Sequence, residues 1–114
     1  MPSYRIKQVN ELVRNELNKV IIKEAGLPKG YLATITKVQT SADLSHSKIS
    51  ISIIPTDKQG TILTLLNNMA KHLQYELGKI IILRKTPNLV FVIDEEQKKA
   101  IHIDELIDKI RKER

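Results

Sequence analysis

The chain has 114 residues, which fits a single domain over residues 1–114, and 41% of them are hydrophobic, enough for a core. It contains no cysteine, which excludes a disulfide framework, a thiol nucleophile and a cysteine-ligated zinc site. Its net charge of +6 favours a polyanionic partner such as nucleic acid, although small lysine-rich domains are often basic without binding one.

The first predicted element is a helix from about Ser3 to Glu24. Its apolar residues recur at helical spacing and form one stripe, made of Ile6, Val9, Val13, Leu17, Val20 and Ile21. Ser3 is the expected N-cap, and Gly26 and Pro28 are expected to end the helix.

A strand is expected from about Tyr31 to Gln39, although its apolar pattern is irregular. Ile35 and Val38 are three positions apart, whereas a half-buried strand alternates with a period of two. Either a β-bulge at Thr36 or Lys37, or burial of the strand on both faces, would explain this spacing.

The second strand, from Lys48 to Pro55, alternates between apolar and polar residues, which predicts one buried side and one solvent-facing side. The polar segment Ser41–His46 before it is short, so it most simply joins two antiparallel strands.

A long helical region is predicted from about Lys58 to Leu83, because apolar residues keep helical spacing throughout it. Asn67 and Asn68 are weak helix formers in the middle of this pattern. We therefore predict a bend between Asn67 and His72, which would let the apolar stripe follow a curved sheet.

A third strand, Leu89–Asp94, follows Pro87, and residues from about Ile103 to Arg114 have the pattern of a short C-terminal helix. Strands flanked by helices in this order predict an α+β fold with two layers. The helices are expected to cover one face of a three-stranded sheet and to leave the other face open.

The sequence offers no evident catalytic, cofactor or metal site. His46, His72 and His102 fall in three separate elements without the spacing of metal ligands, and no glycine-rich phosphate-binding motif is present. No apolar run approaches the ~18 residues of a membrane span, and the N-terminus lacks the apolar core of a signal peptide. We therefore expect a cytoplasmic protein that is not an enzyme and has neither a membrane partner nor a small-molecule substrate.

Positive charges are concentrated in and after the long helical region. Lys71, Tyr75 and Lys79 are spaced to share one helix face, and Arg84 and Lys85 extend the positive row into the following loop. Such a row can neutralise phosphates and release counterions. The alternative interpretation is a lysine-rich face that simply contacts solvent.

Three segments follow one another in an order and spacing that resemble the ribosome-binding factor A family. Arg5–Leu17 is similar to the family's opening helix, R-x-x-x-V-x-x-x-I-R-x-E-L, and Ser41–Ile49 to its block S-P-D-L-S-H-A-K-V. Leu77–Phe91 is similar to the pattern L-G-K-x-x-x-L-R-x-x-P-E-L-x-F. The resemblance covers the chain from about Arg5 to Ile110.

The resemblance implies a type II KH-like domain, α-β-β-α-kink-α-β, with an extra C-terminal helix from about residue 100 to residue 114. In most members the kink is an Ala-x-Gly step, and the matching residues here are Met69, Ala70 and Lys71. Lys71 stands in place of the glycine and does not adopt positive φ cheaply, which leaves the sharpness of the bend open. It also adds a positive charge at the expected RNA-facing corner.

The resemblance further implies a bacterial, monomeric assembly factor that binds the free 30S ribosomal subunit through 16S rRNA and assists late rRNA processing and subunit maturation. The candidate RNA contacts are basic residues of the first helix, the second strand and the long helical region: Arg5, Lys7, Arg14, Lys48, Lys71, Lys79, Arg84 and Lys85.

Two alternatives remain at this point. A generic KH-like protein that binds single-stranded RNA would use a glycine-rich loop and stacked bases, and this chain has no GxxG and one Phe. A small RNA-cleaving enzyme would need grouped catalytic residues, whereas the histidines here are scattered and no acidic metal cluster is evident.

Overall fold

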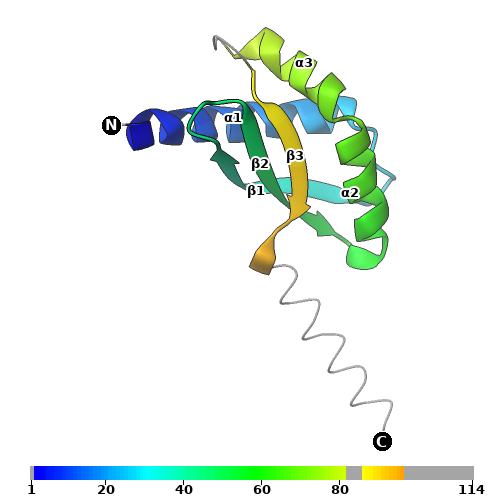
Figure 1. Cartoon of the computed structure of the whole chain (residues 1–114). Coiled ribbons are helices and arrows are strands. Elements are labelled where there is room, and N and C mark those ends of the chain that lie inside the picture. The colour runs from blue at the N-terminus through cyan, green and yellow to red at the C-terminus, as the bar shows by residue number, and fades with distance from the viewer. Residues whose placement is uncertain (1, 82–85, 97–114) are drawn as a thin grey trace, which may run out of the picture.

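The computed structural model describes residues 2–81 and 86–96, and it has the α+β fold expected from the sequence (Figure 1). In chain order the elements are α1 (Pro2–Glu24), β1 (Leu32–Thr40), β2 (His46–Ile54), a short 3-10 helix η1 (Thr56–Lys58), α2 (Gln59–Asn68), α3 (Ala70–Ile80) and β3 (Asn88–Ile93). The C-terminal helix expected from about residue 100 lies outside the described residues. Among the described residues, no helix is both long and apolar enough to span a bilayer.

The boundaries of α1 confirm the predicted helix except at its start. The helix begins at Pro2, so the expectation that Ser3 is the N-cap was wrong. Proline is favoured in the first turn because its fixed φ suits a helix and its missing N–H would have had no helical partner. At the other end, Ala25 N still donates to Ile21 O at 3.0 Å, and Gly26, with φ of 58°, ends the helix as predicted.

The sheet has the strand order β1-β2-β3, with β1 antiparallel to β2 and β2 parallel to β3. The short segment between β1 and β2 therefore joins antiparallel strands, as predicted. The register of this pair shifts between Ile35 and Lys37, which leaves Thr36 as the extra residue of a β-bulge. This bulge confirms the first of the two explanations for the irregular spacing in β1.

The core lies between one face of the sheet and the three helices. Leu17 of α1, Ile51 of β2 and Phe91 of β3 are each at most 1% exposed within it. The alternate residues of each strand point to the opposite face, and no helix of the described part of the chain packs there. This confirms the expected two-layer arrangement, in which α1 crosses behind the sheet in Figure 1.

Two asparagine side chains bond to the outer edges of the sheet. Asn18 Oδ1 of α1 accepts from Ile35 N of β1 at 3.0 Å. Asn67 of α2 bonds twice to the backbone of Phe91 in β3: its Nδ2 donates to Phe91 O at 3.1 Å, and its Oδ1 accepts from Phe91 N at 2.8 Å. Asn67 is therefore a packing residue that ties α2 to the edge strand.

The predicted bend is a break between α2 and α3 at Met69. Met69 has φ of −92° and ψ of 2°, and its N–H points to the carbonyl oxygens of both Leu65 and Leu66. Positive φ occurs at Gly26, Gly30 and Leu44 among the described residues, and thus nowhere in the break. The direction change therefore needs no glycine, and Lys71 fits as the second residue of α3.

Candidate nucleic-acid interface

One face of α3 brings positive charge and an aromatic ring together. Lys71, Tyr75 and Lys79, which we call the α3 face, line one hollow of about 520 Å³. Tyr75 is 64% exposed, and Lys79 Nζ lies 4.6 Å from the centroid of its ring. Lys79 Nζ also lies 3.3 Å from Glu76 Oε1. The predicted sharing of a helix face by these three residues is thus confirmed.

Thr86, two residues before β3, lies directly against α3 and lines this hollow. A Cβ atom on Gly78 would lie 2.9 Å from Thr86 Oγ1, so glycine permits the close approach. From the same helix, Gln74 Nε2 donates to Thr86 O at 2.9 Å. Arg84 and Lys85, the other contacts expected near this hollow, lie outside the described residues.

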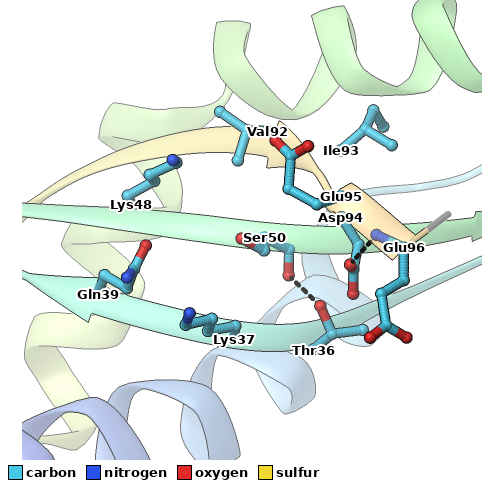
Figure 2. A pocket seen from close by; sticks show the side chains of 10 residues that line it. All are labelled: Thr36, Lys37, Gln39, Lys48, Ser50, Val92, Ile93, Asp94, Glu95 and Glu96. Atoms are coloured by element: carbon cyan, nitrogen blue, oxygen red, sulfur yellow. Dashed lines mark hydrogen bonds between the residues drawn. The ribbon is translucent and has the colours of Figure 1, made fainter. Parts of the chain in front are cut away.

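The remaining candidate contacts lie on other surfaces. Arg5, Lys7 and Arg14 are exposed on α1, which belongs to the same helical layer as α3. Lys48 is exposed on β2 and lines the open face of the sheet, opposite the helices (Figure 2). The basic residues singled out from the sequence are therefore divided between two faces of the molecule.

The open face of the sheet has a second hollow, of about 460 Å³, whose charges are separated (Figure 2). Lys37 and Lys48 lie at one end, and the acidic residues Asp94, Glu95 and Glu96 lie at the other. Lys37 was not among the basic residues singled out from the sequence. The residue spacing nevertheless indicated its position: with a bulge at Thr36, Val38 faces the core, and Lys37 and Gln39 on either side of it face away from the helices.

Hydrogen bonding keeps the acidic end of this hollow charged. Two hydrogen bonds lower the pKa of Asp94 by stabilising its carboxylate. The larger effect comes from the Thr36 side chain, and the smaller from the Glu96 N–H, whose nitrogen lies 2.9 Å from Asp94 Oδ1. Attraction to the Lys37 ammonium also helps to lower the pKa of Asp94. A phosphate near this end would meet a fixed negative charge.

Two of the three histidines lie in described residues, in separate places. His46 is the first residue of β2, and its Nδ1 lies 2.7 Å from Oγ of the preceding Ser45. His72 of α3 contacts the end of α1, with its Nε2 3.3 Å from Glu24 Oε2. Three possible metal ligands come together here, with ligand atoms within 4.8 Å of one another: Glu24, His72 and Glu76. Carboxylate and imidazole groups are typical ligands of a divalent metal. Sequence reasoning missed this grouping, because nothing in the sequence brings the end of α1 beside α3.

Comparison with known proteins identifies the family. The family model described as ribosome-binding factor A matches residues 5–107. The chain belongs to the ribosome-binding factor A family. A ribosome-binding factor A from Pseudomonas entomophila is 32% identical over 108 residues, which cover 92% of this chain and 82% of the relative.

Solved structures of ribosome-binding factor A share the fold. The crystal structure of the protein from Thermus thermophilus matches with a TM-score of 0.67 at 19% identity, covering 77% of this chain and 94% of that one. A homology model of the Thermus thermophilus factor, fitted into a cryo-EM map of a 30S–RbfA complex, matches with a TM-score of 0.56 at 20% identity, covering 71% and 90%.

The block that carries much of the resemblance to ribosome-binding factor A, Ser41–Ile49, holds a local hydrogen-bond network. Asp43 Oδ1 accepts from Ser41 Oγ at 2.7 Å, from Ser45 Oγ at 2.7 Å and from Ser45 N at 3.1 Å. Leu44, which lies between Asp43 and Ser45, adopts a φ of 61° and packs against the core. Ser45 O then accepts from Asn88 N at 2.9 Å, which ties the connection to the start of β3. These residues shape the connection between the strands and dock it on the sheet.

Proposed function

We propose that this protein binds the small ribosomal subunit through 16S rRNA, as a monomer, and assists late rRNA processing and subunit maturation without catalysing a reaction. Membership of the ribosome-binding factor A family supports the ribosomal partner. The related Thermus thermophilus factor, fitted into the map of a 30S complex, supports the small subunit in particular. These relatives support the proposal, and a cytoplasmic setting is proposed with it.

The α3 face is the observation that supports RNA as the component it binds. Its two lysines are exposed on α3 and line a hollow of about 520 Å³. Lysine contacts to phosphate fix the position of a protein on RNA without reading its sequence. A factor that must recognise one place on a folded subunit would then rely on the shape of the RNA around these contacts.

The test is a salt titration of binding to isolated 30S subunits. Replacing both lysines of the α3 face, as Lys71→Gln with Lys79→Gln, should lower the slope of log affinity against log salt by about two units, because each phosphate contact contributes about one. Adding Arg84→Gln and Lys85→Gln should lower it further.

A matched control is available on α1. Lys19 Nζ lies 3.3 Å from Glu16 Oε1, as Lys79 lies from Glu76, so Lys19→Gln removes the same charge and the same kind of ion pair. Neutralising Lys109, Arg111 and Lys112 near the C-terminus provides a second control. Equal losses for the α3 face and the controls, or binding that is independent of salt, would contradict the proposed RNA contact.

A further inference from the structure

Tyr75 differs from the other described aromatic side chains in being open to solvent. Phe91 is 1% exposed in the core, and Tyr31 packs against the core with its hydroxyl donating to Asp57 at 2.7 Å. Tyr75 is 64% exposed at the middle of α3 and has no hydrogen bond to another described residue. An exposed aromatic ring on a positively charged face is unusual in a chain with 4% aromatic residues and a core built from aliphatic side chains.

We propose that Tyr75 is a stacking platform for one unpaired nucleobase of RNA, with Lys71 and Lys79 holding the phosphates on either side of that base. This inference rests on the proposed function and names the chemistry of one contact within it. Lys71 and Lys79 are eight residues apart, about 12 Å along the helix axis, with the ring midway between them. The two lysines offer positive charge to the backbone of a single strand, and Lys79, whose Nζ lies 3.3 Å from Glu76 Oε1, would exchange that carboxylate for a phosphate.

The hollow around Tyr75 favours stacking over reading of base edges. Lys79 Nζ lies over the ring at 4.6 Å, which leaves the opposite ring face for a base. Gln74, the amide side chain in the wall, already donates its Nε2 to Thr86 O. Every base has an aromatic face, so stacking tolerates any sequence, and cation contact on the far side of the ring strengthens it. The occupant is therefore an unpaired nucleotide rather than a particular sequence.

Abasic RNA separates stacking from charge. Wild-type protein would be titrated with short oligouridine and with the same oligomer lacking its bases, which has the same phosphates. Stacking predicts that wild-type protein binds the abasic oligomer roughly 5- to 150-fold more weakly, the range expected for one stacked base. Tyr75→Leu should bind both oligomers equally, whereas Tyr75→Phe, which keeps the ring, should behave like wild type.

A fluorescent variant reports on the ring directly. The chain has no tryptophan, so Tyr75→Trp places a single indole at the site. Its emission should be quenched by oligouridine but not by the abasic oligomer. Tyr31→Trp, whose ring position packs against the core, should respond to neither.

Binding of Tyr75→Leu to 30S subunits distinguishes this inference from the proposed function. Weaker binding to subunits, together with lost discrimination between the oligomers, supports the platform. Two results would exclude the platform while wild-type binding to subunits upholds the proposed function. One is that Tyr75→Leu binds subunits as well as wild type does; the other is that wild type does not distinguish the two oligomers. If wild type distinguishes the oligomers but binds no subunit, the proposed function fails and the platform stands.

Discussion

Asp43 is an exposed carboxylate whose charge supports the shape of the connection between β1 and β2. The hydroxyls of Ser45 and Ser41, followed by the Ser45 N–H, hold the pKa of Asp43 well below its usual range. A lowered pKa in the folded state means that the charged form favours folding. This contribution is present above the unfolded pKa, near pH 4, and is lost as the pH falls through the folded value.

We expect Asp43→Asn to lower the thermal unfolding midpoint at pH 7 by a few degrees. The difference from wild type should shrink as the pH is lowered below about 4, where Asp43 of the unfolded chain becomes protonated, and should vanish once the pH has fallen through the folded pKa of Asp43. Thermal unfolding across a pH series measures this. Asp57→Asn, in the 3-10 helix η1, provides a comparison at another exposed carboxylate. A difference for Asp43→Asn that stays constant down to the lowest pH would show that the charge of Asp43 is not what matters.

At the scale of the elements, α2 is held on the sheet by a side chain that sequence reasoning read as a helix breaker. Asn67 does lie at the end of α2, but its amide forms two hydrogen bonds with Phe91 of β3. The weak helix propensity of asparagine led to the correct position of the break, because propensity reflects the local helix and not its neighbours. The bonding to β3 could not be foreseen, because it depends on which strand lies beside α2.

We predict that Asn67→Ala destabilises the protein by about 1–3 kcal/mol, because two part-buried hydrogen bonds to the edge strand are lost. Urea unfolding measures the change. Asn68→Ala is the matched control, since Asn68 is an exposed neighbour of the same type in the same helix. Equal stability of the two variants would show that the bonds to Phe91 contribute little.

The periodic features of the chain were predictable, and the features created by packing were not. The stripe of α1, the bulge at Thr36 and the break near Asn67 all leave a local trace in residue spacing. The start of α1 was missed because proline and serine are both common at that end of a helix. Contact of His72 with Glu24 joins residues 48 apart, and local spacing carries no information about such a pair.

For the molecule as a whole, the main consequence of folding is that the candidate RNA contacts are split between two faces. The α3 face belongs to the helical layer, whereas Lys48 belongs to the open face of the sheet. These residues were grouped from the sequence because their charge can be read there, whereas the face of the molecule on which each one lies cannot. The role of each in RNA binding stays a prediction.

We expect the α3 face to contribute more to subunit binding than the open face. Replacing Lys37 and Lys48 with glutamine should lower the salt slope by less than replacing Lys71 and Lys79. The reason is that the same hollow holds three carboxylates, which repel a phosphate approaching that face. Parallel salt titrations of the two double variants compare them directly, and a larger effect of the open-face pair would reverse the orientation of the protein on the subunit.

The two asparagines that bond to the sheet edges restrict how any partner can be recognised. Backbone groups in the middle of both outer strands, at Ile35 and Phe91, are already occupied by Asn18 and Asn67. At these two positions an extended peptide or a second copy would have to displace an asparagine side chain before it could pair with the edge strand. The two asparagines therefore oppose, at mid-strand, the edge pairing that leads to aggregation.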